Sequence, residues 1–239
     1  MTELKPNPGK KIEIKIGDRI FERWPIKTHI ITPKDDFLAV IKKYALPHMK
    51  KDDILVIAEK ALAISQGRAF NAEKIKPSRL ARFLTRFITK TPYGIGCSIP
   101  ETMEIGIREA GAPRIILAAA LAAITKPFGI RGIFYKVAGP QVKAIDGPAD
   151  YVIPPYNKYA SLGPKDPEAT AQKLAKKIKH SVIIIDACDL GRWILGASEG
   201  LDRDLICEIF ADNPLGQTNQ QTPLCIVRKK SAKSFSFGG

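Results

Sequence analysis

The chain has 239 residues, of which 45% are hydrophobic and 26% charged, so it is not disordered and can bury the core of one large domain or two small ones. Its longest apolar stretch, residues 115–124, is too short and too rich in alanine to cross a bilayer, and residues 1–11 lack the apolar core of a signal peptide. We therefore expect a cytoplasmic protein with no membrane partner.

In chain order, the sequence predicts a flexible basic arm over residues 1–12, a folded domain over residues 13–229 and a flexible tail over residues 230–239. Strands are predicted at residues 11–16, 53–58, 132–138, 182–185 and 222–230, and helices at residues 35–46, 74–90, 111–124 and 166–180. The last helix has Asp166 as its N-cap, Pro167 at its first position and Glu168 in its first turn. This alternation predicts an α/β (α+β) fold with a mixed β-sheet and flanking helices.

The net charge of +14 is concentrated at both ends of the chain and in the predicted helix at residues 74–90. This helix carries a basic stripe on one side, formed by Arg79, Arg82, Arg86 and Lys90. An apolar stripe of Leu80, Phe83, Leu84 and Phe87 is predicted to face the core. The basic face is typical of a solvated surface, and it leaves open the attraction of an anionic substrate or of nucleic acid. No RNA-binding signature or zinc finger supports nucleic acid, which is the disfavoured partner.

The four cysteines are scattered widely along the chain, at Cys97, Cys188, Cys207 and Cys225. They include no CxxC pair and lie near no histidine cluster, which indicates neither a zinc site nor a disulfide framework. We expect reduced thiols that are mostly buried.

The segment SVIIIDACDLGRW, residues 181–193, contains the first candidate site. Its β-branched block is typical of a strand buried on both faces, and Asp186, Cys188 and Asp189 follow at once. Ligands of open α/β sheets bind outside the carboxyl ends of such strands. An aspartate in this position also often caps a turn, so for Asp186 alone both interpretations stay open.

Common nucleotide-binding and catalytic motifs are absent: the sequence contains no GxxxxGK[ST], GxGxxG, HExxH or GxSxG. The remaining candidates are acids in turns (Asp146, Asp150, Asp186 and Asp189) and the amide-rich residues 216–221. Such oxygen ligands suit Mg²⁺ or Mn²⁺, and a metal pair can hold a polyphosphate for displacement at phosphorus. By spacing alone this signal is weak, because acids in glycine-rich turns are ordinary.

Seven segments, in the same order, resemble the γ-glutamyl ligase family that adds L-glutamate to the deazaflavin coenzyme F-420 precursor. They are THIITPKDDF, DDILVIAEKALAISQGR, PETMEIGIREAG, KAIDGPADYV, GPKDPEATAQKLAKKI, IIIDACDLGRW and PLGQTNQQTPLCIVR, between about residue 24 and residue 229. The resemblance implies a γ-glutamyl ligase-like fold in an intertwined homodimer, GTP or ATP as co-substrate, two Mg²⁺ or Mn²⁺ ions and an acyl-phosphate intermediate.

Carried over to this chain, the family's metal-binding residues fall on Asp146 and Gln217. Its Ser-Asp-Thr-Phe-Gly-Arg segment falls on ACDLGR, which places Cys188 where the family has aspartate and Asp189 where it has a metal-binding threonine. We expect a rearranged site in which Asp186 and Asp189 act as ligands and Cys188 points into the core.

The resemblance also implies nucleotide contacts in three segments, at Thr28, His29, Ile30, Ile31, Glu59, Lys60, Gly216, Gln217, Thr218 and Asn219. Two further contacts of the family are lost, because a lysine aligns with Ile64 and an asparagine with Ala149. From the sequence alone, Lys60 is equally well a surface lysine, and His29 is better explained as a packed or backbone-bonded side chain than as a catalytic one.

The sequence therefore predicts a metal- and nucleotide-dependent ligase that forms a γ-glutamyl amide from L-glutamate and an anionic acceptor. The acceptor is the deazaflavin coenzyme precursor or a folate. Two alternatives remain: a basic nucleic-acid-associated binding protein, and an inactive relative of the ligases, to which Cys188 would point.

Overall fold

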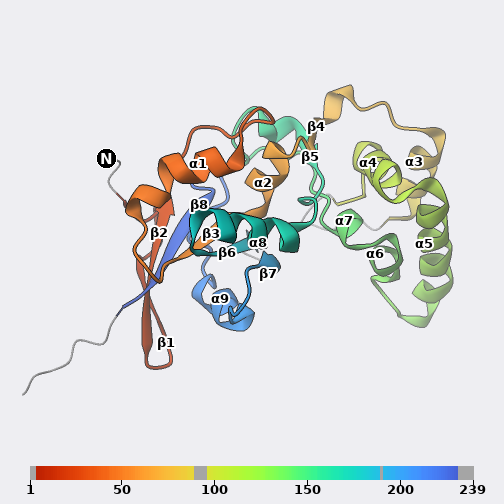
Figure 1. Cartoon of the computed structure of the whole chain (residues 1–239). Coiled ribbons are helices and arrows are strands. Elements are labelled where there is room, and N and C mark those ends of the chain that lie inside the picture. Colours follow the sequence, from red (N-terminus) through yellow and green to blue (C-terminus); the bar gives the residue numbers. More distant parts are fainter. Residues whose placement is uncertain (1–3, 89–95, 189–190, 231–239) are drawn as a thin grey trace, which may run out of the picture. The chain divides into compact units, whose positions relative to one another are not determined.

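The computed structural model describes residues 4–88, 96–188 and 191–230 (Figure 1). The chain divides into two compact units, Met1–Ser65 with Asp166–Gly239 and Gln66–Lys165. We call the first the sheet unit and the second the helical unit. Folding of residues 13–229 as a single domain stays a prediction.

The sheet unit contains a six-stranded mixed sheet in the order β1-β2-β8-β3-β6-β7. Its strands are β1 (Glu13–Ile16), β2 (Arg19–Ile26), β3 (Ile54–Ala58), β6 (Ser181–Cys188), β7 (Gly191–Ala197) and β8 (Leu224–Lys229). Only β3 and β6 pair in parallel, and the other neighbours are antiparallel. The predicted mixed sheet is confirmed.

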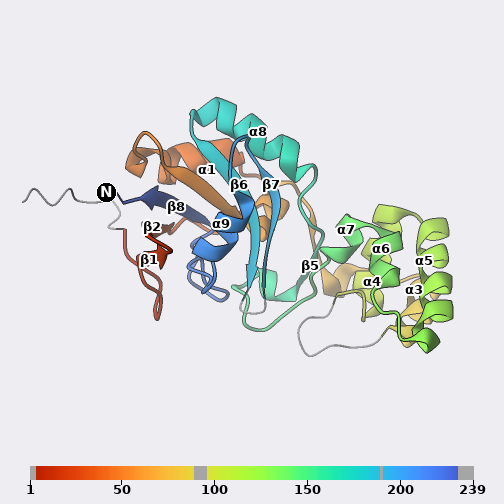
Figure 2. The same cartoon turned by 90° about the horizontal axis from the view of Figure 1, so that it is seen from below.

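Helices cover both faces of this sheet: α1 (Phe37–Tyr44), α2 (Glu59–Ser65), α8 (Pro167–Ile178) and α9 (Arg203–Ile209), with the short 3-10 helix η1 (Leu46–His48). Figure 2 shows α1 and α8 on one face and α9 on the other. Ile183 and Ile185 of β6 pack in one cluster with Ile206 and Ile209 of α9. The continuous β-branched block of β6 is thus buried on both sides, as its sequence predicts.

The start of α8 differs in one detail from the prediction. Pro167 occupies the first turn and Glu168 is acidic there, as expected. Asp166, however, has a φ of 44° and its side chain makes no capping bond. Its backbone carbonyl instead accepts a hydrogen bond from the Thr170 amide at 2.9 Å, so the carboxylate takes no part in the cap.

The helical unit is built from short helices around one core. It contains α3 (Arg79–Leu84), α4 (Pro100–Ala110), α5 (Ala112–Thr125), α6 (Ile133–Ala138), α7 (Pro140–Lys143), the antiparallel strands β4 (Ala69–Asn71) and β5 (Tyr159–Ser161), and the 3-10 helices η2 (Ala72–Lys74), η3 (Thr85–Phe87), η4 (Lys126–Phe128) and η5 (Tyr156–Lys158). Among the described residues of both units, no helix is long and apolar enough to cross a membrane.

The strand predicted at residues 132–138 is wrong, because this segment forms α6. Its β-branched and aromatic residues favour a strand locally. Phe134 and Ala138, however, lie four positions apart, and both are buried in the core that includes Ile115 and Ala118 of α5. Tertiary packing against α5 therefore overrides the local preference.

The apolar stripe predicted over residues 74–90 is only partly in the core. Ala81 and Leu84 are buried, whereas Phe83 and Phe87 are 53% and 63% exposed. The α-helix ends at Leu84 and gives way to η3, so the spacing of an uninterrupted helix no longer applies. The basic face is confirmed where it is described, since Arg79, Arg82 and Arg86 are exposed, and Lys90 lies outside the described residues.

All four cysteines are free thiols, but only Cys97 and Cys225 are buried; Cys188 and Cys207 are partly exposed. Burial raises the pKa of Cys97 to about 12 and also raises the pKa of Cys225. At pH 8 we expect a maleimide to modify Cys188 and Cys207 in the native protein, and Cys97 and Cys225 only after unfolding, because neither buried thiol forms the reactive thiolate. Peptide mass spectrometry after timed labelling measures this, and early modification of Cys97 would contradict the core of the helical unit.

Candidate functional site

Four chain segments end or begin at one edge of the six-stranded sheet. Ala58 at the end of β3 pairs with Ile185 of β6, and the strands are parallel, so their carboxyl ends share this edge. Leu224 at the start of β8 pairs with Ile57 of β3 and with Ile26 at the end of β2. The loop before β8 and the segment after β2 therefore meet the same edge, which we call the carboxyl edge. Sheets of this class bind ligands at such an edge.

The end of β6 supplies Asp186 and Cys188 to the carboxyl edge. Side chains alternate along a strand, so both residues lie on the face of Ile184, opposite that of Ile185 and Ala187, which pack toward α9. Both are partly exposed. Cys188 is only partly buried and shares this face with the Asp186 carboxylate, so the expectation that its thiol points into the core stays a prediction. Asp189 lies outside the described residues.

The loop before β8 is built around Gly216 and Gln220. Gly216 has a φ of 76°, and a Cβ at this position would come within 2.6 Å of the Gln220 side chain. Gln220 Oε1 in turn accepts hydrogen bonds from the Thr218 amide (2.8 Å) and hydroxyl (3.0 Å). Gln217 Nε2 is buried and has no hydrogen-bond partner among the described residues. A buried amide nitrogen in this state is a donor available to an anionic ligand.

Both ends of this loop are anchored by residues far away in the sequence. The Asn7 side-chain amide donates to the Pro214 carbonyl and to the Thr222 hydroxyl, each at 2.8 Å, and the Thr222 hydroxyl donates to the Leu215 carbonyl at 2.6 Å. Asn7 is only 8% exposed. The basic arm predicted at residues 1–12 is thus tied down at Asn7, and nothing in the local pattern around this asparagine indicates it.

The segment after β2 is held to the same loop. The Thr28 amide donates to the Gln221 carbonyl at 2.9 Å, and the Thr28 hydroxyl donates to the His29 carbonyl at 2.7 Å. Thr28 and Ile31 are buried, while Ile30 is 37% exposed. The Thr28–Ile31 segment predicted to contact nucleotide therefore lies beside the Gly216–Asn219 loop with the same predicted role.

The ring of His29 is held by side chains rather than by the backbone. Its Nε2 lies 2.8 Å from Asp35 Oδ1, and its Nδ1 lies 3.0 Å from the Tyr44 hydroxyl. Hydrogen bonds from Thr32, and then from His29, lower the pKa of Asp35. Sequence reasoning missed Asp35 and Tyr44, because a spacing of six and fifteen residues matches no motif. Both ring nitrogens are thus engaged by side chains, and of the two non-catalytic interpretations, packed or backbone-bonded, these contacts favour the first.

Glu59 and Lys60 follow β3 directly and form the first turn of α2, where both are partly exposed. They therefore lie at the carboxyl edge, between the end of β6 and the start of β8. Ile64 in the last turn of α2 is 6% exposed. At the position where the resemblance places a nucleotide-contacting lysine, this chain therefore has a packed apolar residue.

Asp146 belongs to the helical unit. Its backbone forms an isolated bridge with Ser161, with both N–H···O distances at 2.8–2.9 Å, and it is partly exposed. Among the described residues, no three His, Cys, Asp or Glu side chains form a group that could hold a metal ion. The structure thus brings Asp186 to one edge with the three predicted nucleotide-binding segments, and the joint action of Asp146, Asp189 and Gln217 stays a prediction.

Comparisons with known proteins show the family of the chain. A comparison with curated proteins gives no match. The family model described as F420-0:Gamma-glutamyl ligase matches residues 25–198. The matched range includes the segments after β2 and β3 and the end of β6, and it stops before the loop that contains Gln217. Because it spans well over half of the chain, the protein belongs to the F420-0:γ-glutamyl ligase family, a family of amide-forming ligases.

Proposed function

We propose that the protein is a metal- and nucleoside-triphosphate-dependent γ-glutamyl ligase that adds L-glutamate to the deazaflavin coenzyme F-420 precursor. The observation that supports it best is the carboxyl edge itself. There an aspartate from β6, two charged residues after β3 and a glycine-containing amide loop come together beside the Thr28–Ile31 segment. This combines an anionic group that attracts cations with donors that suit phosphate oxygens.

The donor set fits a hard divalent cation. Within the sheet unit, Asp186 and Asp189 would supply carboxylate oxygens and Gln217 its amide oxygen for Mg²⁺ or Mn²⁺. The resemblance adds Asp146 of the helical unit as a further carboxylate ligand. The buried Gln217 Nε2 then remains as a donor to a phosphate oxygen, which gives its unsatisfied N–H groups a partner. Two cations bound there would neutralise negative charge on the triphosphate.

The residues of the edge would bind and orient GTP or ATP. The nucleotide is contacted by Thr28–Ile31, Glu59, Lys60 and Gly216–Asn219. Hydrogen bonds from Asn7 and Thr28 hold the loop before β8 and the segment after β2 in place. A carboxylate of the acceptor attacks the γ-phosphorus and releases the nucleoside diphosphate. The amino group of glutamate then attacks the acyl phosphate, releases inorganic phosphate and leaves the γ-glutamyl amide.

A mass-spectrometric assay tests the proposal. The purified protein is incubated with L-glutamate, Mg²⁺ or Mn²⁺, GTP or ATP, and either the deazaflavin precursor or a folate. We expect the deazaflavin acceptor to gain the mass of a glutamyl residue only when nucleotide and metal are both present. Glutamate added to folate alone would identify the alternative acceptor, and no product with either acceptor would contradict the ligase proposal.

The quaternary structure and the activity of the altered metal site are parts of the same proposal. The resemblance implies a homodimer, which light scattering of the purified protein measures directly. The chain has Cys188 where the family has an aspartate, so an inactive relative is the rival within the family. Turnover in the assay above excludes that rival.

A further inference from the structure

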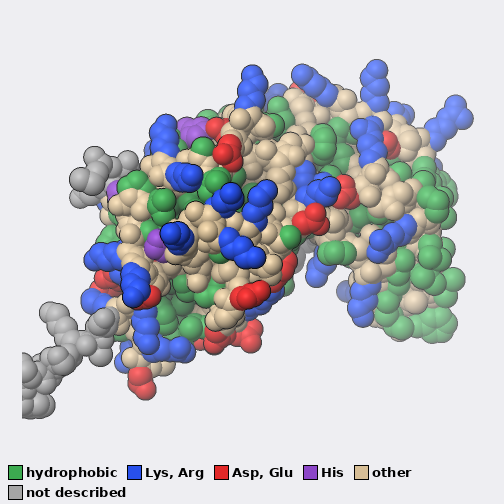
Figure 3. Space-filling view, viewed as in Figure 1, with side chains coloured by type: hydrophobic (Ala, Val, Ile, Leu, Met, Phe, Trp, Pro, Cys, Tyr) green, Lys and Arg blue, Asp and Glu red, His purple; other side chains and the backbone are tan. Residues whose placement is uncertain are grey.

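The helical unit exposes a large apolar surface that the proposed ligase reaction does not use. We define the α5 face as the exposed large apolar side chains of α3, η3 and α5 and of the turn after α5: Phe83, Phe87, Ile116, Leu117, Leu121, Ile124, Phe128 and Ile130. Phe128 is 78% exposed and Ile124 is 62% exposed. Figure 3 shows hydrophobic side chains gathered over α5. Single exposed leucines are ordinary on a protein surface, but a contiguous group of this kind marks an interaction site.

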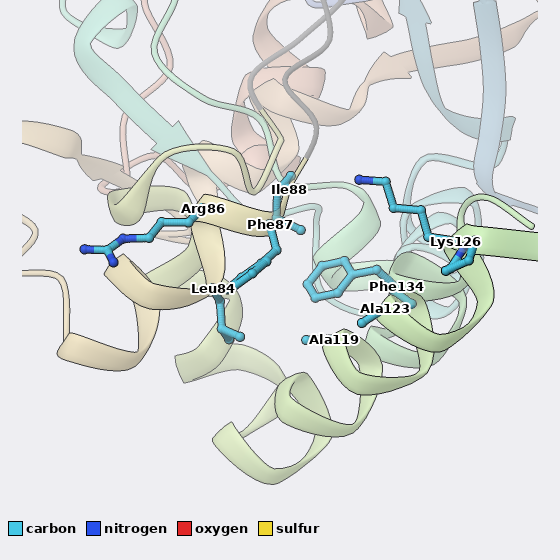
Figure 4. Close-up of a pocket in the computed structure, with 10 residues that line it drawn as sticks. Leu84, Arg86, Phe87, Ile88, Ala119, Ala123, Lys126 and Phe134 are labelled. Carbon is cyan, nitrogen blue, oxygen red and sulfur yellow. The ribbon is translucent and has the colours of Figure 1, made fainter. Parts of the chain in front are cut away.

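A pocket opens beside this face. It has a volume of about 650 Å³ and lies between η3 and α5. Figure 4 shows Leu84 and Phe87 on one wall and Ala119, Ala123 and Phe134 on the other. Arg86 and Lys126 also line it. The pocket is thus apolar inside and carries cations at its margin.

The two sequence stretches that carry the α5 face contain cations and no acids, and the acids nearest to them along the chain include those of α4. Residues 74–99 and 110–145 contain no Asp or Glu, although both stretches contain several Lys and Arg residues. Arg82 and Arg86 alternate with Phe83 and Phe87 along η3 and the end of α3, and all four are exposed. In the same way, the exposed cations Lys126 and Arg131 bracket the turn that carries Phe128 and Ile130.

This charge pattern favours one class of partner over a second copy of the chain. Two copies that pair α5 face to α5 face would bring arginines and lysines against each other, with no acid in either stretch to neutralise them. A homodimer formed through another surface is unaffected by this argument. An anionic lipid surface complements the same pattern, because its phosphates meet the cations while its acyl region receives the apolar side chains. Exposed aromatic residues flanked by basic ones fit the interface of such a bilayer better than the surface of a nucleic acid, which offers no apolar layer to Phe128.

We propose that the protein binds peripherally to anionic membranes through the α5 face. Phe128 and Ile130 enter the boundary between headgroups and acyl chains, Ile124 and Phe87 follow, and Arg82, Arg86, Lys126 and Arg131 contact lipid phosphates. No spanning helix is needed for such an interaction, so the expectation of no membrane partner, which rested on the absence of a spanning stretch, does not address it. The proposal is independent of the ligase activity.

Vesicle co-sedimentation of the full chain tests it. Vesicles of phosphatidylcholine mixed with phosphatidylglycerol are compared with vesicles of phosphatidylcholine alone, at about 0.1 M NaCl, where surface charges still act over about 10 Å. We expect binding to the anionic vesicles only. Phe128→Ser is expected to weaken it about tenfold or more, because a phenylalanine side chain is no longer buried in the bilayer.

Two matched controls separate the apolar contribution to membrane binding from the electrostatic one. Tyr151→Ser removes an aromatic side chain that is 59% exposed in the same unit but outside the α5 face, and it should leave binding unchanged. Arg86→Ser should weaken binding more than Lys158→Ser, because Lys158 lies outside the face and pairs with Glu73 at 3.0 Å. The four substituted residues are exposed: Arg86, Phe128, Tyr151 and Lys158. Circular dichroism should therefore show the same helix and strand content in every variant.

Three results would overturn the proposal. The first is no binding of the unmodified protein to anionic vesicles. The second is binding that Arg86→Ser weakens and Phe128→Ser does not, which indicates a purely electrostatic polyanion site such as one for nucleic acid. The third is a dimer in light scattering that Phe128→Ser converts to a monomer, which would assign the α5 face to a second copy.

Discussion

Asp186→Asn is expected to lower kcat/KM for glutamate ligation by at least about 100-fold, because loss of an outer-shell partner of a metal ligand already costs 10- to 100-fold. The carboxylate lies at the carboxyl edge, at the end of a strand whose preceding four residues are buried. Asparagine keeps the size of the side chain and removes its charge. The change therefore removes the negative charge and has little effect on packing.

Metal affinity provides the decisive second measurement. In a titration with Mn²⁺, followed by electron paramagnetic resonance or calorimetry, Asp186→Asn should lose at least one site. Asp52→Asn is the matched control, because Asp52 is an exposed acid just before β3, at the opposite end of the strand from the carboxyl edge. It should keep both activity and metal binding. If Asp186→Asn behaves like this control, Asp186 only terminates the strand, and the rearranged metal site is wrong.

Part of the sheet unit was predictable because the elements of that part carry local signals, whereas β2, β7, α2 and α9 were not predicted. The β-branched blocks of β3 and β6 and the Pro167–Glu168 start of α8 each specify an element within a few residues. The order of elements then places the ends of β3 and β6 at one edge, since parallel strands share their carboxyl ends. The sequence alone therefore identifies Asp186 as a candidate residue.

The remaining features depend on contacts between residues far apart in the chain. Asn7 fixes the loop before β8 across 207 residues, and no local pattern around an asparagine reveals such a partner. The helical unit shows the same limitation. Residues 132–138 have the composition of a strand, yet burial of Phe134 and Ala138 beside α5 makes them a helix. Phe83 is exposed because α3 buries its Ala81 and Leu84 side instead, and Phe87 lies beyond the end of α3.

Gly196→Ala is expected to destabilise the sheet unit by about 3 kcal/mol or more, at the upper end of what overpacking costs. Gly196 pairs with Ile184 in the sheet. A Cβ at Gly196 would lie 2.3 Å from the backbone carbonyl carbon and oxygen of Pro167 and 2.6 Å from the Glu168 nitrogen. These are backbone atoms at the start of α8, so no side-chain rotation can make room and the helix itself must move.

Gly17→Ala separates this crowding from backbone strain. Gly17 lies in the turn between β1 and β2 with a φ of 56°, and a Cβ there would meet no atom within 4 Å. Its replacement should cost about 1–2 kcal/mol, from the left-handed conformation alone. Gly196 has no positive φ, so its larger cost would come from the close approach of α8.

Urea unfolding followed by tryptophan fluorescence measures the stability of the sheet unit in both variants. The two tryptophans, Trp24 in β2 and Trp193 in β7, both belong to that unit. We expect a larger fall in midpoint for Gly196→Ala than for Gly17→Ala at similar slopes. Because α8 leads directly into β6, the shift that alanine forces on α8 should also displace Asp186, so the surviving folded protein should bind Mn²⁺ more weakly. Equal midpoints for the two variants would mean that α8 does not pack closely against Gly196. That result would also contradict the predicted effect of α8 on Asp186 at the carboxyl edge.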